Sequence, residues 1–185
     1  MDDSNCILDE VEYHGQEYNR IVKRWKNPQG KLFRINGPAM SFETLHNNGS
    51  RTLAEYWYQI PGKIHRTNSP AIIESRGENI VLYEIWYKND KKFREINLPS
   101  TVSYHEFNKS IHSLHGLDEI LDISHKKIKQ LKYTNEEGEI HRTNGPAVIE
   151  YNEQGEVIFE KYYLNNIRLD FEEYQKINSN VQSVG

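Results

Sequence analysis

Apolar and polar residues alternate along several short segments of this chain, which is the pattern of β-strands rather than of helices. In the segment IVLYEIWYK, the alternation puts Val81, Tyr83 and Ile85 on one face of a strand. Short stretches that contain glycine, namely HNNGS, SRGEN and NEQGE, separate such segments. The strongest turn signal is Asn48-Gly49, because a type I′ turn needs positive φ and matches the twist of paired strands. The pattern therefore predicts antiparallel hairpins.

One sequence motif occurs twice along the chain, almost unchanged. GKIHRTNSPAIIE begins at Gly62 and GEIHRTNGPAVIE begins at Gly138, and ten of the thirteen positions are identical. A third copy, GKLFRINGPAM, begins at Gly30, and a worn fourth copy, KKFREINLPS, begins at Lys91. Repetition of this kind predicts a tandem array in which each unit packs on its neighbours. The recurring arginines and prolines of the three clearer copies are Arg34, Arg66, Arg142, Pro38, Pro70 and Pro146.

An aromatic phrase recurs with the first one. EYWY, EIWY and EKYY share a glutamate, any residue, then Trp or Tyr, and then Tyr. Each unit thus contains a strand after Pro-Ala, a glycine turn, a longer aromatic strand and a second turn. Proline fits the strand entry because it lacks a backbone donor. The recurring acids are Glu55, Glu84 and Glu160, and the aromatic residues Trp57, Trp86 and Tyr162 are predicted to occupy equivalent sites on one sheet face.

The repeated His-Arg pairs allow two interpretations. They could bind phosphate or take part in catalysis, or each arginine could stack on a repeat aromatic or pair with the repeat glutamate. Residues copied into every unit usually hold the units together, which favours the structural interpretation. The histidines at 65 and 141 are replaced by Phe33 and Phe93 in the other copies, and a phenyl ring cannot do the chemistry of an imidazole. No catalytic residue is therefore predicted.

The predicted fold class is mainly β: tandem antiparallel hairpin or meander repeats forming a curved sheet, with short capping helices. A first helical cap is expected in residues 100–111 and a second in 168–178. A further helix from residue 118 to 128 is expected to link the two units. Helix is therefore predicted mainly in residues 103–128 and 170–177. The prediction divides the chain into an N-terminal repeat array with its helical cap, residues 1–122, and a shorter second unit with the C-terminal capping helix, residues 123–185.

Composition narrows the function classes. The chain is 36% hydrophobic and 27% charged, but 12 Tyr, 6 Phe and 3 Trp supply large buriable surfaces. A net charge of -4 argues against nucleic-acid binding, and no apolar run is long enough for membrane insertion. The N-terminus lacks a secretory h-region, and the single Cys6 forms no internal disulfide. These features predict a cytoplasmic protein.

The longest stretch that the units do not share is the insertion at residues 105–132. His112 and His115 lie three apart, but the stretch has no cysteine and no HExxH pattern, so no metal and no cofactor is predicted. The basic run HKKIKQLK could contact an acidic partner, or it could be a solvated face. Insertions in repeat proteins commonly lie on the binding face; the alternative is a simple cap and link between two lobes. The candidate partner-binding residues are His112, His115, Lys126, Lys127 and Lys129.

The phrases HRTNGPAVIE, EIWYKND and YYLNN resemble degenerate MORN-like repeats of the MORN-variant class, over about residues 20–100 and 128–176. Arrays of this kind are common in large DNA viruses and also occur in phages and bacteria. The resemblance implies hairpins laid side by side in a sheet, with interaction or scaffolding roles. A bacterial subset looks like antitoxin or immunity components.

The expected function is that of a non-catalytic module that binds a host or partner protein through the repeat sheet or the insertion. If the chain is viral, its place is the host cytoplasm. One alternative is an antitoxin-type or immunity-type inhibitor of a partner enzyme. Another is a hydrolase or nuclease with a site built from histidines and carboxylates. The identity of the partner and the oligomeric state stay open at this point.

Overall fold

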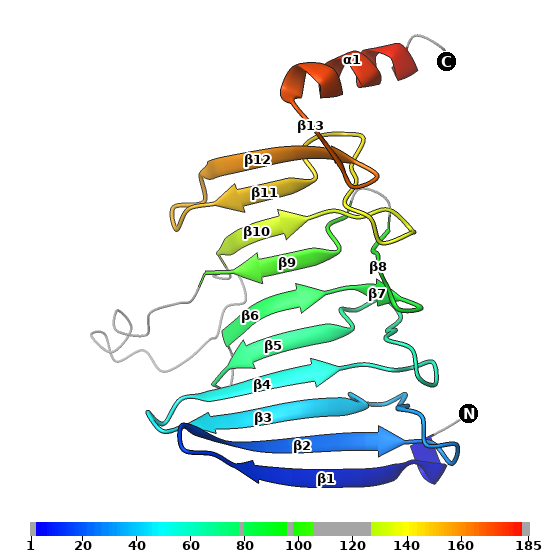
Figure 1. Ribbon diagram of the computed structural model, residues 1–185, viewed down its shortest axis with the longest axis vertical. Coiled ribbons are helices and arrows are strands. Elements are labelled where there is room, and N and C mark those ends of the chain that lie inside the picture. Colours follow the sequence, from blue (N-terminus) through cyan, green and yellow to red (C-terminus); the bar gives the residue numbers. More distant parts are fainter. Residues whose placement is uncertain (1–2, 78–79, 96–97, 106–126, 183–185) are drawn as a thin grey trace.

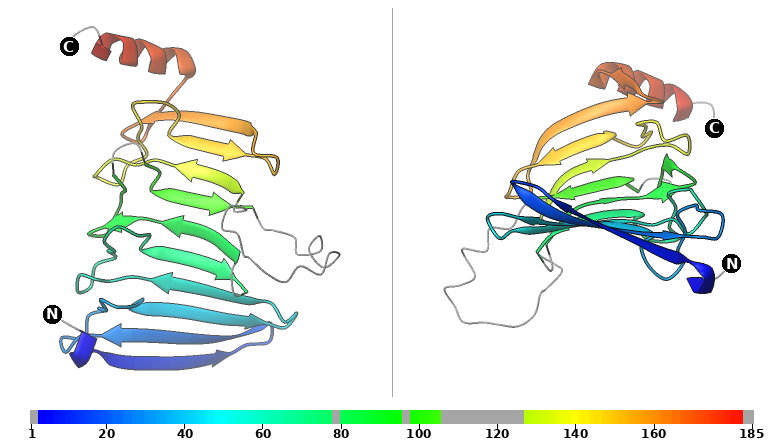
Figure 2. Two further views of the ribbon diagram at one scale, coloured as in Figure 1. Left: turned by 180° about the vertical axis from the view of Figure 1, so that it is seen from behind. Right: turned by 60° about the horizontal axis from the view of Figure 1, so that its bottom comes forward.

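The chain folds into one long antiparallel sheet that stays open at both ends. The computed structural model describes residues 3–77, 80–95, 98–105 and 127–182. Eleven strands follow the order β1-β2-β3-β4-β5-β6-β9-β10-β11-β12-β13, and a separate two-stranded ladder joins β7 to β8. The sheet is twisted, and no second layer of described elements covers it (Figures 1 and 2). The predicted meander of antiparallel hairpins is confirmed.

The strands are short, from two to nine residues. The first six strands are β1 (Ile7–His14), β2 (Tyr18–Lys26), β3 (Met40–His46), β4 (Arg51–Tyr56), β5 (Ile72–Arg76) and β6 (Ile80–Ile85). The remaining strands are β7 (Tyr87–Lys88), β8 (Lys91–Lys92), β9 (Thr101–Tyr104), β10 (Ile128–Lys132), β11 (Val148–Tyr151), β12 (Val157–Leu164) and β13 (Ile167–Leu169). A 3-10 turn, Asp3–Asn5, precedes the sheet, and the helix α1, Phe171–Gln182, follows it.

Long connections between successive hairpins lie at one edge of the sheet and tight turns at the other, as alternate strand direction requires. The long connections, called arginine loops here, are residues 27–39, 57–71, 86–100 and 133–147. Each one carries one copy of the repeat phrase. The sheet therefore positions the four copies in a column along a single edge (Figure 1).

Each arginine loop joins the sheet through the same backbone bonds. An aromatic residue at the strand end donates its N–H to a small residue across the ladder: Trp57 donates to Ala71, and Tyr133 donates to Ala147, over 2.8 and 2.9 Å. These small residues are fully buried, with an exposed fraction of 0%. A larger side chain has no room there, which explains the alanine of the repeat phrase. The four equivalent pairs are Trp25–Ala39, Trp57–Ala71, Trp86–Ser100 and Tyr133–Ala147.

The repeated arginines stack on these aromatic rings. The guanidinium of Arg66 lies over the ring of Trp57, and its Nη1 donates to the carbonyl oxygen of Pro70 over 3.2 Å. A ring face attracts a cation, and the planar guanidinium keeps its edge free to donate hydrogen bonds. The distances from guanidinium carbon to ring centroid are 4.2 Å for Arg34–Trp25, 3.4 Å for Arg66–Trp57, 4.0 Å for Arg94–Trp86 and 3.8 Å for Arg142–Tyr133. Of the two arrangements predicted for a structural arginine, stacking is present in all four copies.

The expectation that Trp57, Trp86 and Tyr162 share a sheet face is confirmed by the strand register. Tyr56 pairs with Ile72, and Ile72 pairs with Ile85, so the residues that follow Tyr56 and Ile85 both point to the opposite face. We call the face that carries the stacked aromatics the stack face and the other one the tyrosine face. The alternation predicted for residues 81–88 holds from Tyr83 onwards, because a register shift places Val81 opposite Ser75.

The last ring of the column is covered by α1 instead of by an arginine. Tyr162 packs on Phe171 and Tyr174, with ring centroids 5.3 and 4.7 Å apart. Asp170 starts the helix as its N-cap, accepting from the N–H of Glu173, whose carboxylate accepts from the N–H of Asp170. The C-terminal cap predicted from residues 168–178 is therefore present, and it continues to residue 182.

The first predicted cap is wrong over its described part. Residues 101–104 form β9, and the linking segment predicted as helix up to 128 ends at Ile128, the first residue of β10. Val102 is buried and lies opposite Leu131, so β-branched and aromatic side chains that alternate in burial favour a strand here. The rest of that prediction, residues 106–126, lies outside the described residues.

The sheet is continuous across the division predicted at residues 122 and 123. β10 pairs with β9 on one side and with β11 on the other. The insertion at residues 105–132 therefore includes β10, and only its residues between β9 and β10 occupy the position of a hairpin turn within the array. The division into the units 1–122 and 123–185 stays a prediction.

The phrase that occurs twice makes the same contact twice. The ring Nδ1 of His65 accepts the N–H of Asn89, and the ring Nδ1 of His141 accepts the N–H of Asn165, over 3.4 and 3.1 Å. His65 faces a two-residue turn in the next arginine loop, and His141 faces the equivalent turn at the end of β12. In each turn both residues have positive φ: Asn89, Asp90, Asn165 and Asn166. In both copies of the phrase that contain histidine, the ring therefore accepts a hydrogen bond from the same kind of turn.

Replacing Arg66 by alanine should lower the free energy of unfolding by about 1–3 kcal/mol, because a stacked cation and its hydrogen bond to Pro70 are both lost. Arg51→Ala is the matched control, since Arg51 makes an exposed ion pair with Glu43 at 2.8 Å. The control should cost less than about 1 kcal/mol. Denaturant unfolding of both variants decides this, and equal losses would contradict a structural role for the stack.

The bond from Asn89 to His65 should make stability depend on pH. Burial, followed by the charge of Lys88, lowers the pKa of His65 from its ordinary value of 6.5. The folded state thus favours the neutral ring, so this stability is complete above pH 6.5 and is lost as the pH falls through the lower folded pKa. His65→Asn keeps an acceptor oxygen near Nδ1 but does not titrate.

We therefore expect the wild type to lose more thermal stability than His65→Asn between about pH 7 and about pH 5. Thermal unfolding at both pH values measures this difference. Parallel losses in the two proteins would show that His65 is not the titrating group.

Candidate functional site

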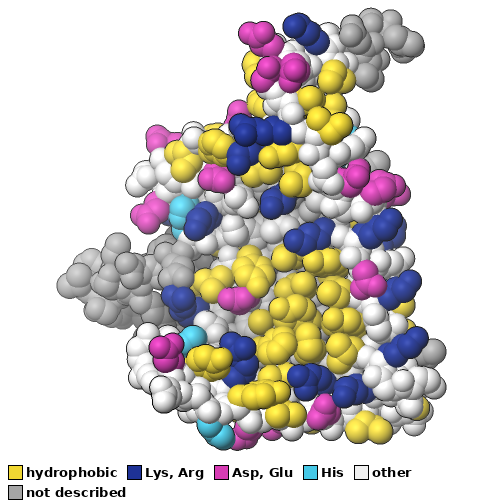
Figure 3. All heavy atoms as spheres, in the orientation of Figure 1, with side chains coloured by type: hydrophobic (Ala, Val, Ile, Leu, Met, Phe, Trp, Pro, Cys, Tyr) yellow, Lys and Arg dark blue, Asp and Glu magenta, His cyan; other side chains and the backbone are white. Residues whose placement is uncertain are grey.

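Apolar side chains gather on the tyrosine face over one half of the sheet. One register row across β3–β6 consists of Met40, Tyr56, Ile72 and Ile85. In the neighbouring row, Val22 pairs with Phe42 and Phe42 pairs with Ala54. Figure 3 shows hydrophobic side chains gathered over the lower strands. An apolar area on an uncovered sheet face is the type of surface that binds partners.

Four tyrosines converge on this half of the face. The tyrosine cluster consists of Tyr56, Tyr58, Tyr83 and Tyr87, all partly buried. Burial is the main cause that raises the pKa of each phenol, and neighbouring acidic groups raise it further. Tyr56 and Tyr58 both interact with Tyr87, although Tyr87 lies in a different arginine loop. Two connections of the array thus contribute to a single cluster.

Polar groups surround the cluster at defined points. The hydroxyl of Tyr83 donates to the carboxylate of Glu74 over 2.6 Å, and the charge of Asp90 raises the pKa of Tyr58 and Tyr87. Phe42 meets Tyr56 edge-on, with centroids 5.6 Å apart. Large amphipathic rings with a few fixed polar groups resemble the centre of a protein interface more than a catalytic site.

Arg20 extends the aromatic surface toward the other edge. Its guanidinium carbon lies 5.0 Å from the ring centroid of Tyr18 and 6.0 Å from that of Phe42, and its Nε donates to Thr44. Tyr18 itself is 38% exposed. Arginine next to aromatic rings is a typical composition for a binding surface.

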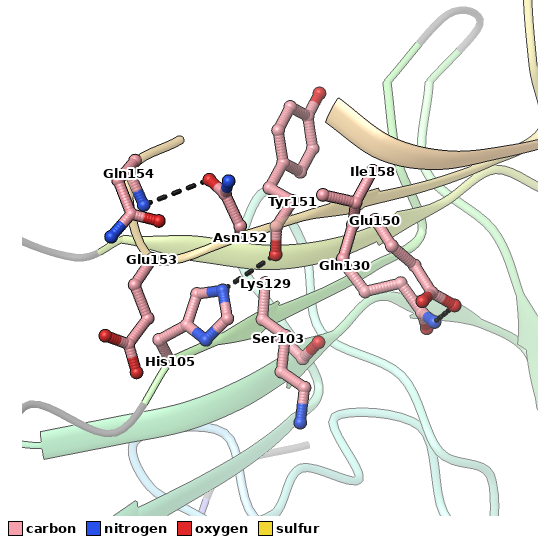
Figure 4. A pocket seen from close by; sticks show the side chains of 10 residues that line it. All are labelled: Ser103, His105, Lys129, Gln130, Glu150, Tyr151, Asn152, Glu153, Gln154 and Ile158. Carbon is pink, nitrogen blue, oxygen red and sulfur yellow. Dashed lines mark hydrogen bonds between the residues drawn. The ribbon is translucent and has the colours of Figure 1, made fainter. Parts of the chain in front are cut away.

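A hollow lies at the turn edge of the sheet, beside β9, β10, β11 and β12 (Figure 4). Its volume is about 600 Å³, and it opens to solvent. The Nε2 of His105 lies 2.8 Å from the carbonyl oxygen of Tyr151, and Gln130 donates to Glu150 over 3.0 Å. The lining residues are Ser103, His105, Lys129, Gln130, Glu150, Tyr151, Asn152, Glu153, Gln154 and Ile158. Some of these polar groups already form hydrogen bonds within the hollow, so the hollow is a weaker candidate for a binding site than the tyrosine cluster.

The predicted partner-binding residues fall near this hollow or outside the described residues. Lys127 is exposed beside β10, and Lys129 lies on β10 and lines the hollow. His112, His115 and Lys126 lie outside the described residues. The described portion of the basic run therefore includes strand β10.

The repeated acids and aromatics are engaged with the array itself. The carboxylate of Glu84 accepts from the hydroxyl of Tyr104 over 2.5 Å, and that of Glu160 accepts from Tyr162 over 3.3 Å. Burial raises the pKa of Glu55, while the charge of Arg66 opposes that rise. Sequence reasoning missed Trp25 and Tyr133 as ring positions. It also missed the tyrosine cluster, for which the alternation around Tyr83 was the available signal.

Comparison with known proteins adds no family to this picture. No family model matches the chain, and neither a curated protein nor a solved structure matches it. Within the part of the chain that the structure describes, no group of three or more His, Cys, Asp and Glu side chains could hold a metal ion. None of the described helices is long and apolar enough to cross a membrane.

The cluster should be visible in a tyrosinate titration. Burial and the hydrogen bond to Glu74 keep Tyr83 protonated above the ordinary tyrosine pKa of 10.0. Glu74→Gln removes the carboxylate charge, so the pKa of Tyr83 should fall while that of Tyr104, which bonds Glu84, stays raised. Alkaline absorbance titration of wild type, Glu74→Gln and Tyr83→Phe isolates this one phenol. An unchanged titration in Glu74→Gln would contradict the geometry.

Proposed function

We propose that this protein is a non-catalytic interaction module that binds a partner protein with the tyrosine cluster of its repeat sheet. The observation that carries the proposal is the convergence of four partly buried tyrosines on a sheet face that no other described element covers. Tyrosine provides large contact area and a polar group at little cost in side-chain entropy. The interaction roles implied by the MORN-like resemblance agree with this function.

The stacked arginines support the proposal indirectly. The guanidinium groups of Arg34, Arg66 and Arg142 are each already occupied by a ring and a proline carbonyl, so the repeat residues are explained by the array. What distinguishes one part of the sheet from another is the set of side chains on the tyrosine face. A partner that binds there would contact Tyr58 and Tyr87, which recur in the aromatic phrase, together with Tyr56 and Tyr83, which do not.

The cytoplasm, or the host cytoplasm for a viral chain, is the proposed location, on the basis of the single cysteine. Inhibition of a partner enzyme, as in antitoxin or immunity proteins, would be one consequence of such binding. Nothing observed in the geometry favours it over other partners, and the same holds for a hydrolase or nuclease activity.

Site-specific photocrosslinking tests the proposal. A benzophenone-bearing phenylalanine replaces Tyr87 in the cluster or, as a matched control, Ile158 in the hollow at the turn edge. In a lysate of the producing cells, Tyr87 should yield a discrete protein adduct that Ile158 does not. The adduct is identified by mass spectrometry, and that protein is purified for direct binding.

Tyr87→Ala should then raise the Kd of the purified protein by about tenfold or more, while Ile158→Ala should leave it within about twofold. Thermal unfolding of each variant checks that the array is intact. If adducts form from position 158 instead, or if Tyr87→Ala binds as well as wild type, the turn edge becomes the better site and the proposal fails.

A further inference from the structure

The row of the tyrosine face that contains Tyr56 continues beyond the apolar half. Ile85 pairs with Thr101, Thr101 with Lys132, Lys132 with Val148, and Val148 with Lys161. Two lysines therefore follow the apolar side chains on the same face and in the same line. Neighbouring strands are spaced by about 4.8 Å, so the α-carbons of Lys132 and Lys161 are about 10 Å apart.

Lys92 adds a third positive charge to this end. It pairs with Tyr87 in the β7–β8 ladder, so it lies beside the tyrosine cluster. Burial is the main cause that lowers the pKa of Lys92, and the nearby charge of Lys132 lowers it further. Two ammonium groups close enough to oppose each other attract an anionic partner.

These three lysines lack a carboxylate partner within the described part of the chain. The ion pairs found there involve Arg or Lys side chains of β2 and β4, with one exposed histidine on β1. Lys161 instead lies 4.6 Å from the ring centroid of Phe159. No ion pair of the described residues therefore neutralises the charges of Lys92, Lys132 and Lys161.

We propose that the tyrosine cluster and the lysine row, Lys92, Lys132 and Lys161, form one strip that binds a protein segment carrying apolar side chains followed by carboxylates. This inference rests on the proposed function and names the chemistry of the partner. From Tyr56 to Lys161 the strip crosses six strand spacings, or about 29 Å, which about nine extended residues span. Apolar side chains anchor the segment on the tyrosines, and carboxylates reach the lysines.

Charge distribution selects a protein over a nucleic acid. A single-stranded nucleic acid also combines stacking with positive charge, but its phosphates are evenly spaced along the chain. Here the carboxylates of Glu74 and Asp90 lie among the tyrosines, Lys92 lies beside Tyr87, and Lys132 and Lys161 lie toward the other end. An evenly charged polyanion would be repelled at the tyrosine end, whereas a segment with charge at one end only fits both halves.

The test uses three labelled probes and the full chain. The first is a peptide of about twelve residues whose first half alternates Phe and Ser and whose second half alternates Glu and Ser. The second replaces each Glu by Lys, and the third is an oligothymidylate of equal length. Fluorescence anisotropy gives each Kd at low and at physiological salt. Lys132→Glu with Lys161→Glu is the test variant, and Lys63→Glu with Lys176→Glu, two exposed lysines elsewhere, is the matched control.

We expect the acidic peptide to bind the wild type at least about tenfold more tightly than the basic peptide and the oligonucleotide, with affinity that falls as salt rises. The test variant should lose about tenfold in affinity, and the control should stay within about twofold. Equal binding of the two peptides, tighter binding of the oligonucleotide, or equal loss in both variants would overturn the inference.

The two proposals fail in distinguishable ways. If Tyr87→Ala weakens the photocrosslinked partner but the lysine variant does not, the tyrosine cluster is a binding site and the lysine row is no part of it. If neither change weakens that partner, both the proposed function and the inference about its chemistry fail.

Discussion

The arginine–aromatic stack is the interaction on which the rest of the structure depends. A meander of short strands needs long connections at one edge, and such connections lose conformational entropy when they become ordered. In each arginine loop a guanidinium lies over a ring, and in the three clearer copies it also donates to a proline carbonyl, so the loop is held against the sheet by its own side chains. At Arg34 the loop leaves so little room that a Cβ at Gly37 would come within 2.7 Å of the guanidinium carbon.

Because the stacks lie on one face, they leave the two faces of the sheet chemically different. The stack face holds the stacked rings and the repeated acids, and the tyrosine face holds the last tyrosine of the aromatic phrase together with residues that vary between units. The end of the array follows the same logic, since Tyr174 covers the ring of Tyr162 and bonds the loop backbone at Thr143 and Gly145. Structure and specificity are thus divided between opposite sides of a single layer.

Sequence reasoning predicted the features that depend on local, repeated contacts. Hairpins, the stacked arginines and the C-terminal cap all follow from short phrases. It failed where two patterns overlap: Val102 and Tyr104 alternate as in a strand, but Tyr104 also begins an apolar helical stripe, and pairing with β10 decided for the strand. Trp25 and Tyr133 were missed because no glutamate precedes them by two positions. The tyrosine cluster was missed because the register of β4, β5 and β6 brings the repeated Tyr58 and Tyr87 together with Tyr56 and Tyr83, and the short phrases do not give that register.

A double-mutant cycle on Arg66 and Trp57 tests the central claim most directly. The free energy of unfolding is measured for the wild type, Arg66→Ala, Trp57→Leu and the double variant. If the stack holds the loop, the two substitutions are coupled by about 1 kcal/mol or more, because either change alone already removes the contact. Additive effects, within about 0.3 kcal/mol, would contradict the account.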